Sequence, residues 1–186
     1  MSRGKLILVT GGIRSGKSDF AGRHAARSGK EVIYLATTGA KDLEMRHQIE
    51  ERRQRRPHTF RVVEEPLHPE RVLAEGKASV IFIVDCLTLL LGNHLQQKLK
   101  GKVEISWEKQ LAITSAVMDY VDDLAEQMLR CPADVIAVTN EMGWGITPES
   151  IPGRLLRNLA GRANQLFAAR ADEVWLTICG IARRFK

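Results

Sequence analysis

The sequence predicts a doubly wound α/β fold with a mostly parallel central sheet and helices on both of its faces. Two observations support this prediction. Short apolar runs recur along the chain without alternating with polar residues, and helix-compatible segments fill the gaps between them. Strands that are buried on both faces of a parallel sheet have this continuous apolar character. The length of 186 residues fits one domain, so we expect residues 1–186 to form a single unit.

The expected strands are short runs rich in valine, isoleucine and leucine. They cover Leu6–Val9, Val32–Ala36, Val80–Val84, Val135–Val138 and Val174–Ile178, with Phe60–Val63 as a further candidate. The expected helices cover Lys17–Ser28, Asp42–Arg56, Trp107–Arg130 and Pro152–Arg170. The third helix is the clearest, because its apolar residues recur at helical spacing. Its predicted apolar face consists of Trp107, Leu111, Val117, Met118, Val121, Leu124, Ala125 and Met128.

The composition argues against several classes of protein. No stretch approaches the roughly 20 unbroken apolar residues that cross a bilayer, and the first residues lack the pattern of a signal peptide. The three cysteines, Cys86, Cys131 and Cys179, are scattered, which favours reduced thiols over disulfides or a zinc site. The net charge of +6 is compatible with phosphorylated substrates, and with aromatic residues at 5% a nucleic-acid platform is disfavoured. We therefore expect a cytoplasmic protein without a membrane span or a nucleic-acid partner.

A glycine-rich loop carries the strongest chemical signal. The pattern Gly-x-x-x-x-Gly-Lys-Ser is met in full by Gly11, Gly12, Ile13, Arg14, Ser15, Gly16, Lys17 and Ser18. An apolar strand precedes the loop and a helix-compatible segment follows it, which disfavours a chance glycine-rich turn. Backbone N–H groups and the helix N-terminus would then surround the phosphates of ATP or GTP. Lys17 would bind the β- and γ-phosphates and Ser18 would bind Mg²⁺, so the fold is expected to be that of a P-loop NTPase.

Asp85 is the expected second protein ligand of the magnesium ion. It ends the apolar run Val80–Val84, and an acid at the tip of a buried strand holds Mg²⁺ in P-loop proteins, directly or through water. The alternative is that Asp85 caps a helix that starts at Leu87, since aspartate is a good N-cap residue.

Four segments together resemble one family. They are residues 9–18 (VTGGIRSGKS), 34–37 (YLAT), 138–148 (VTNEMGWGITP) and 161–165 (GRANQ), which leads into 171–174 (ADEV). The chain resembles the bifunctional adenosylcobinamide kinase / adenosylcobinamide-phosphate guanylyltransferase family of cobalamin biosynthesis over nearly its whole length. The most specific segment is Thr-Asn-Glu-x-Gly-x-Gly-Ile, which begins at Thr139.

The resemblance implies two activities. The kinase activity phosphorylates the aminopropanol hydroxyl of adenosylcobinamide, and the second activity transfers GMP from GTP onto that phosphate through a GMP-histidine intermediate. The resemblance also implies a homotrimer. Alternatives are a P-loop kinase for another small alcohol, or a nucleotide-binding protein that has lost catalysis.

The chain departs from the pattern of the family seriously at one position and more mildly at Asn158, where the family often has Asp. The nucleophilic histidine is expected where this chain has Arg52, and arginine stays protonated and cannot replace it. His47 lies on a different side of the expected helix and His58 lies after it. Either histidine could substitute, but the pattern favours a solvated surface residue for each. Guanylyl transfer is therefore in doubt, or it uses another residue.

Further binding residues are expected near the nucleotide. By resemblance these are Ala36, Thr37, Thr38 and Glu64, with Glu64 suited to guanine and a surface loop acid as its alternative. The run Arg53, Gln54, Arg55 and Arg56 could bind phosphates or form a solvated helix face. Glu141 ends a strand, where open α/β sheets bind ligands, and could orient the attacking hydroxyl or join the magnesium shell. A plain turn is the alternative for Glu141.

Overall fold

A seven-stranded sheet forms the centre of the computed structural model, which describes residues 3–38 and 58–186. The strands are β1 (Leu6–Gly11), β2 (Glu31–Ala36), β3 (Arg61–Glu64), β4 (Val80–Asp85), β5 (Asp134–Val138), β6 (Glu173–Ile178) and β7 (Ile181–Arg184). Their order across the sheet is β3-β2-β4-β5-β1-β6-β7. The pairs among β1 to β6 are all parallel, and β7 alone among the described strands pairs antiparallel. The carboxyl ends of β1 to β6 therefore meet at one edge of the sheet.

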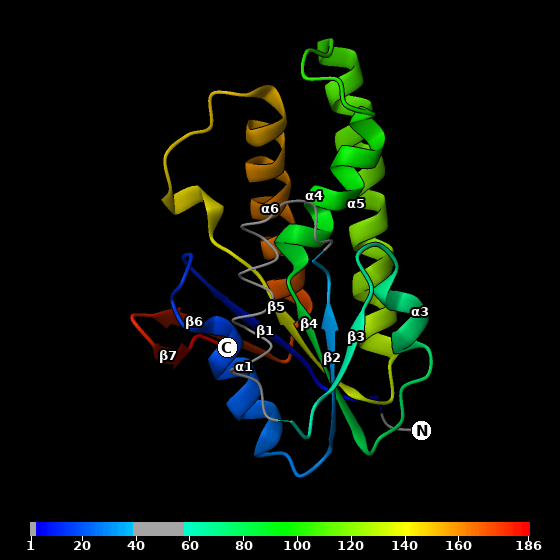
Figure 1. The fold of residues 1–186 in the computed structure, drawn as a ribbon, viewed down its shortest axis with the longest axis vertical. Coiled ribbons are helices and arrows are strands. Elements are labelled where there is room, and N and C mark those ends of the chain that lie inside the picture. Colours follow the sequence, from blue (N-terminus) through cyan, green and yellow to red (C-terminus); the bar gives the residue numbers. More distant parts are fainter. Residues whose placement is uncertain (1–2, 39–57) are drawn as a thin grey trace.

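The helices cover both faces of this sheet (Figure 1). They are α1 (Lys17–Ala26), α3 (Pro69–Leu73), α4 (Leu87–Leu99), α5 (Trp107–Arg130) and α6 (Ile151–Arg170), with a short 3-10 turn η1 (Met142–Trp144). Alternate residues of β1 separate the two layers, since Leu6 and Leu8 belong to the core beneath α4, α5 and α6. Ile7 and Val9 belong to the core beneath α1. This explains the continuous apolar runs, because each strand is buried on both sides.

The predicted α/β architecture is confirmed, and most predicted elements agree closely with the structure. The bounds of α5 match the prediction, and α6 starts one residue earlier. The helix α1 ends at Ala26 rather than Ser28, before Gly29 with a φ of +70°. The predicted helix Asp42–Arg56 lies outside the described residues. No described helix is both long enough and apolar enough to cross a membrane.

The predicted apolar face of α5 is wrong at its first turns. Trp107 and Leu111 are 66% and 52% exposed, whereas burial begins at Ile113 and continues through Met128. The reason is visible in Figure 1, where the start of α5 and the end of α4 extend beyond the sheet and its other helices. Helical spacing shows which side of a helix is apolar. It does not show which turns of that side are covered by the core.

Besides the short turn η1, three described elements were not among the expected strands and helices. The helix α4 is apolar on several sides and packs against both α5 and α6, so it lacks an amphipathic pattern. The helix α3 has only five residues. The strand β7 follows β6 through Cys179 and Gly180, which have φ values of +51° and +81° and form a two-residue hairpin turn.

Candidate functional site

The glycine-rich loop lies at the carboxyl edge of the sheet, between β1 and α1. Gly11 has a φ of +150°, and a Cβ atom there would come within 2.3 Å of the Thr177 carbonyl oxygen on β6. Gly16 has a φ of +94°, and a Cβ atom there would lie 3.1 Å from Gly180 Cα. Gly180 N also donates to the Ser15 carbonyl oxygen at 2.9 Å. The loop thus requires glycine at both motif positions, and the β6–β7 hairpin supports it from the side.

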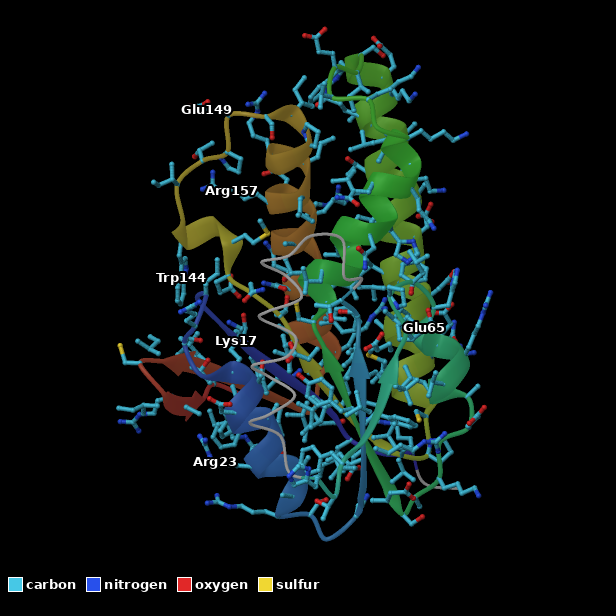
Figure 2. The ribbon with its side chains drawn as sticks, viewed as in Figure 1. Lys17, Arg23, Glu65, Trp144, Glu149 and Arg157 are labelled. Carbon is cyan, nitrogen blue, oxygen red and sulfur yellow. The ribbon has the colours of Figure 1, made fainter. Side chains whose placement is uncertain are left out.

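Lys17 is buried under this loop at the start of α1. Its Nζ atom donates to the carbonyl oxygens of Gly11, at 3.0 Å, and Gly12, at 2.5 Å. The neighbouring Ser18 is half-buried in the first turn of α1. Figure 2 shows Lys17 at the point where the loop enters the helix. An ammonium group beside inward-facing loop amides is suited to triphosphate oxygens.

Asp85 is buried at the end of β4, two strands from the loop. Its Oδ2 atom accepts a hydrogen bond from the Tyr34 hydroxyl on β2. The helix α4 begins at Leu87 with Cys86 at the cap position and no side-chain cap, so Asp85 does not cap this helix. That alternative is wrong, and Asp85 remains available as an acid at a strand tip.

Glu141 follows β5 and faces the loop. Its backbone N–H donates to the Gly11 carbonyl oxygen at 3.0 Å. Its Oε1 atom accepts from Thr10 Oγ1 at 2.6 Å and from Asn164 Nδ2 at 3.0 Å. These bonds tie Glu141 to the strand that carries the phosphate loop, so it is not a residue of an unconstrained turn.

The end of β2 forms another wall of the site. Ala36 is buried, and the hydroxyl of the buried Thr37 donates to the Cys86 carbonyl and accepts from the Cys86 N–H. Asn93 on α4 donates to the Thr37 carbonyl at 2.9 Å. The side chain of Thr37 therefore holds the backbone after β4, and Thr38, the next residue, faces the pocket.

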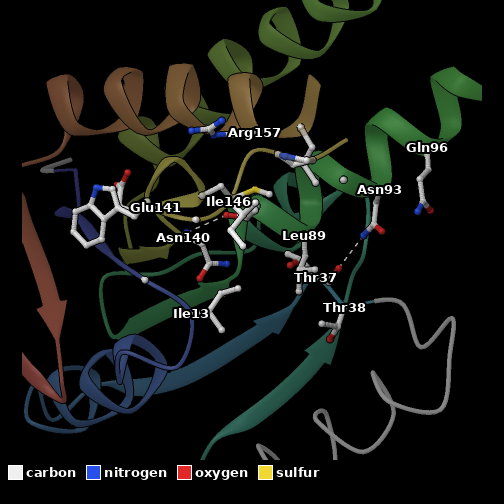
Figure 3. A pocket seen from close by; sticks show the side chains of 18 residues that line it. Ile13, Thr37, Thr38, Leu89, Asn93, Gln96, Asn140, Glu141, Ile146 and Arg157 are labelled. Atoms are coloured by element: carbon white, nitrogen blue, oxygen red, sulfur yellow. Dashed lines mark hydrogen bonds between the residues drawn. The ribbon is translucent and has the colours of Figure 1, made fainter. Parts of the chain in front are cut away.

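A pocket of about 630 Å³ opens between these parts (Figure 3). Its walls come from the phosphate loop, the end of β2, the first turns of α4, the segment after β5 and the side of α6. The lining side chains include Ile13, Thr38, Leu89, Asn140, Glu141, Met142, Trp144, Ile146 and Leu156. Ile13, Trp144 and Ile146 are 84%, 62% and 97% exposed, which gives the pocket an apolar rim. Such volumes are typical of small-molecule sites.

Two arginines of α6 donate hydrogen bonds to the loop that forms the rim of the pocket. Arg157 donates to Thr147 Oγ1 at 2.6 Å and to the Gly143 carbonyl at 3.2 Å. Arg154 donates to the carbonyl oxygens of Pro148 and Glu149. The loop after Glu141 is thus attached to the helix that forms one side of the pocket.

The structure does not bring every expected residue together. Glu64 is exposed at the carboxyl end of β3, in register with Ala36 and therefore at the site's edge of the sheet. His58 is exposed before β3, where the parallel register places it toward the opposite edge. His47, Arg52, Arg53, Gln54, Arg55 and Arg56 lie outside the described residues.

Four functional neighbours were not anticipated: Thr10, Asn93, Asn164 and Thr177. Asn164 lies within the quoted segment Gly-Arg-Ala-Asn-Gln, so a signal existed, but its partners Thr139, Asn140 and Glu141 all lie in the segment after β5. Thr10 also lies within a quoted segment, residues 9–18, but it precedes the phosphate-loop pattern and was given no role. Their roles depend on contacts between strands that are distant in the sequence.

A family model described as cobinamide kinase / cobinamide phosphate guanyltransferase matches residues 7–185. This chain belongs to that family. Among its relatives, the bifunctional adenosylcobalamin biosynthesis protein CobU of Escherichia coli (strain K12) is 40% identical over 185 residues, or 97% of this chain and 99% of that protein. The protein of the same name from Salmonella typhimurium (strain LT2) is 38% identical over the same shares. The bifunctional protein CobP of Pseudomonas aeruginosa is 38% identical over 96% of each chain.

Solved structures support the fold of this cobinamide kinase family member. A prototypical ATPase from the type III secretion system of pathogenic bacteria superposes with a TM-score of 0.57 at 13% identity, covering 95% of this chain and 51% of that chain. The type III secretion ATPase EscN gives 0.56 at 14% identity, covering 95% and 43%. At these identities the likeness shows the P-loop NTPase fold alone, and it confirms the predicted fold class.

Proposed function

We propose that this protein phosphorylates the aminopropanol hydroxyl of adenosylcobinamide and then transfers GMP from GTP onto the phosphate. The single observation that carries the proposal is a phosphate loop that opens directly onto a pocket bearing Glu141, in a chain of this family. The names of the relatives, which describe bifunctional proteins of adenosylcobalamin biosynthesis, support both activities.

The kinase step uses groups that the loop holds in place. The substrate hydroxyl oxygen attacks the γ-phosphorus in line, the bond to the β-phosphate oxygen breaks, and the nucleoside diphosphate leaves. Lys17 and the loop amides stabilise the charge on the transferred group. Glu141 accepts the proton of the attacking hydroxyl, for which its place in the pocket lining opposite the loop is suitable.

Ser18 and Asp85 fit a magnesium ion by the chemistry of their donors. Mg²⁺ prefers oxygen ligands and commonly takes one or two from the protein, with phosphates and water completing its shell. A buried carboxylate at a strand tip and a hydroxyl at the start of α1 supply such oxygens at the same edge of the sheet. When bound, the ion would supply positive charge that offsets the charge on the phosphate oxygens of the nucleotide.

The shape of the pocket suits one end of a large substrate. A volume of about 630 Å³ holds a ligand of drug size, and a corrinoid with its adenosyl group is larger. The aminopropanol arm would enter, and the corrin ring would remain against the exposed apolar rim of Ile13, Trp144 and Ile146. This arrangement also distinguishes a corrinoid from a small free alcohol, which would leave the rim uncovered.

The second activity is supported by the family and not by a located nucleophile. Arg52 occupies the expected histidine position, and His58 lies toward the opposite edge of the sheet. His47 is the remaining candidate of the two, and Glu64 together with residues 53–56 would contact the guanine nucleotide. Resemblance also supports a homotrimer, which sedimentation at several protein concentrations would test, and the composition favours a cytoplasmic location.

The test uses two labels on the same protein. γ-labelled ATP or GTP with adenosylcobinamide should give labelled adenosylcobinamide phosphate. α-labelled GTP, followed by denaturation and peptide mapping, should give an acid-labile adduct on a histidine if the relay is retained. Phosphorylation without an adduct would reduce the protein to a kinase. Tight nucleotide binding without either product would contradict the proposal and favour a protein that only binds nucleotide.

A further inference from the structure

Asn164 is a buried polar residue on α6 that no phosphate-binding motif includes. It is 8% exposed, and its amide contacts three residues of the segment that ends β5. Asn164 Oδ1 accepts from Thr139 Oγ1 at 2.7 Å. Asn164 Nδ2 donates to the Asn140 carbonyl at 3.1 Å and to Glu141 Oε1 at 3.0 Å. The amide thus uses both of its N–H groups, and one of them reaches the carboxylate in the pocket.

The remaining hydrogen bonds determine which way this amide points. Asn140 N–H donates to Thr88 Oγ1 at 3.0 Å, and Thr88 Oγ1 lies 3.2 Å from Thr139 Oγ1. Because Thr139 gives its only hydroxyl proton to Asn164, Thr88 must be the donor to Thr139. The bonds therefore form a closed directional ring that starts at the Asn140 N–H and returns to the Asn140 carbonyl.

One N–H group of Asn164 is not used within this ring, and it donates to Glu141 Oε1. If the Asn164 amide were flipped, its N–H groups would face the Thr139 hydroxyl and its oxygen would face both the Asn140 carbonyl and the Glu141 carboxylate. Two acceptor–acceptor contacts would result, and a buried unpaired acceptor costs about 1–3 kcal/mol. The ring thus holds the N–H donor toward Glu141 in one orientation.

A second donor restrains the same oxygen. Thr10 Oγ1 donates to Glu141 Oε1 at 2.6 Å, while the Glu141 N–H is bonded to the Gly11 carbonyl that also accepts from Lys17. Among the described residues, the structure assigns hydrogen-bond partners to Oε1 and none to Oε2. One carboxylate oxygen is therefore restrained twice, and the other is left for a group in the pocket.

We propose that Asn164 is a positioning residue that, through the ring of Thr88, Thr139 and Asn140, aims Glu141 Oε2 at the attacking hydroxyl of the substrate. This inference rests on the proposed kinase function and names a residue on which that function depends. Positioning of this kind holds the reacting atoms within attack distance, and small displacements reduce turnover strongly.

The main variant is Asn164→Asp, which keeps the size of the side chain and the acceptor for Thr139. It replaces the N–H donor with an oxygen that faces the Glu141 carboxylate, so the two groups repel each other. We expect kcat for phosphorylation of adenosylcobinamide to fall by about 100-fold, with KM for the nucleotide nearly unchanged. Asn158→Asp is the matched control, because Asn158 lies on the same helix, is not buried, and undergoes the identical change in charge.

A double-mutant cycle tests whether Asn164 acts through Glu141. Glu141→Gln supplies an N–H group for the carboxylate that Asn164→Asp introduces, so Asn164→Asp should cause little further loss in the Glu141→Gln background. Thr139→Val opens the ring without adding charge and should lower kcat about tenfold, and Thr139→Ser should restore it. The two Thr139 variants also test the proposal if the Asn164→Asp variant does not fold. Multiplicative losses in the cycle, or unchanged kcat in both Asn164→Asp and Thr139→Val, would overturn the proposal.

Crystal structures of the wild type and of Thr139→Val separate this proposal from the proposed function. A Glu141 side chain that leaves Thr10 when the ring is opened supports the positioning role, and one that stays in place contradicts it. These structures need no substrate. Failure of the wild type to phosphorylate adenosylcobinamide would instead count against the kinase function.

Discussion

The two edges of the sheet use charged residues in different ways. At the edge where the strands begin, acidic and basic side chains pair with one another. Arg3 forms two hydrogen bonds with Asp172, at 2.7 and 2.8 Å, and Lys30 pairs with Asp134 at 2.7 Å. Lys5 adds a third pair with Glu173 at 3.2 Å. The pairs of Arg3 and Lys5 connect the start of β1 to the start of β6, and the pair of Lys30 connects the start of β2 to β5.

At the edge where the strands end, three charged residues form hydrogen bonds with neutral groups. Lys17 donates to two carbonyl oxygens, Glu141 accepts from a hydroxyl and an amide, and Asp85 accepts from a tyrosine hydroxyl. Neutral partners orient a charge without neutralising it. The comparison teaches that charges at the first edge contribute to folding, whereas those at the second can act on a ligand.

The largest expected contrast is between a lysine from each edge. Lys17→Ala should lower kcat for phosphoryl transfer by about 100- to 1,000-fold, because it removes a charge aimed at the transferred group. Lys30→Ala should leave turnover unchanged and lower the free energy of unfolding by less than about 1 kcal/mol. Steady-state kinetics and urea unfolding of both variants measure the contrast. Equal effects on turnover would refute the distinction between the edges.

Two glycines give the next contrast. Gly16→Ala places a side chain at a φ of +94° and against Gly180, whereas Gly29→Ala has a φ of +70° and open space. Both substitutions should destabilise the fold by about 1–2 kcal/mol through the left-handed backbone. Only Gly16→Ala should also reduce nucleotide affinity, by about tenfold or more. Calorimetric titration with a nonhydrolysable ATP analogue would show this, and a similar loss in Gly29→Ala would contradict it.

The contribution of the Arg3–Asp172 pair to the free energy of unfolding should depend on pH. Hydrogen bonding to Arg3 is the main cause that lowers the pKa of Asp172 to about 2, from 3.8. Since the folded-state pKa lies below the unfolded one, the stabilisation is present above about pH 4 and is lost as the pH falls toward 2. Because the pair is partly exposed, Asp172→Asn should cost only about 1 kcal/mol at pH 7. Urea unfolding at pH 7 and pH 3 should show a smaller difference between variant and wild type at pH 3, with catalysis at pH 7 unaffected.

The smallest effect is expected at His94 on α4, which contacts the segment after β3. Burial is the main cause that lowers the pKa of His94, and its ring packs on Tyr120 with a centroid distance of 3.9 Å. The facing charged groups are Glu70, on α3 beside Tyr120, His68, which pairs with Glu70, and Lys98 on α4. A lowered folded-state pKa means that the unfolded chain binds the proton more readily, so stability falls as the pH drops below about 6.5.

The measurement compares unfolding at pH 7.5 and pH 5.5. The wild type should lose roughly 0.5 kcal/mol more than His94→Gln over this interval. Glutamine keeps an N–H group for the Leu67 carbonyl, which His94 Nε2 approaches to 2.8 Å. An identical pH dependence in the two proteins would show that His94 does not titrate in this range.

Much of the fold could be predicted from the sequence because the signals for it are local. The strand β1, the glycine loop and the start of α1 follow one another in the chain, and Gly11, Gly16 and Lys17 carry their chemistry within one short segment. Apolar runs revealed the strands because burial on both faces leaves no polar position. The helix α4 was missed for a related reason, since its first turns are buried and show no polar face.

Only part of the candidate site could be predicted from the sequence. Asp85 was recognised at a strand tip, but sequence alone left open whether it capped the next helix, and the cap position of Cys86 decided this. Trp107 and Leu111 had the correct spacing for a buried face, yet they lie where no second layer covers them. His58 is close in sequence to the expected nucleophile, and the register of β3 places it toward the other edge.

The sequence by itself determined the α/β class, the phosphate loop and membership of a family, because each depends on residue types at short, regular spacings. Tertiary structure alone decided which side chains meet Glu141. Thr10, Thr88, Thr139 and Asn164 come from β1, α4, the end of β5 and α6, and they converge because parallel strands end at one edge beneath these helices. Hydrogen bonds between segments far apart in the chain leave no periodic pattern, so only the folded protein shows how the carboxylate is aimed.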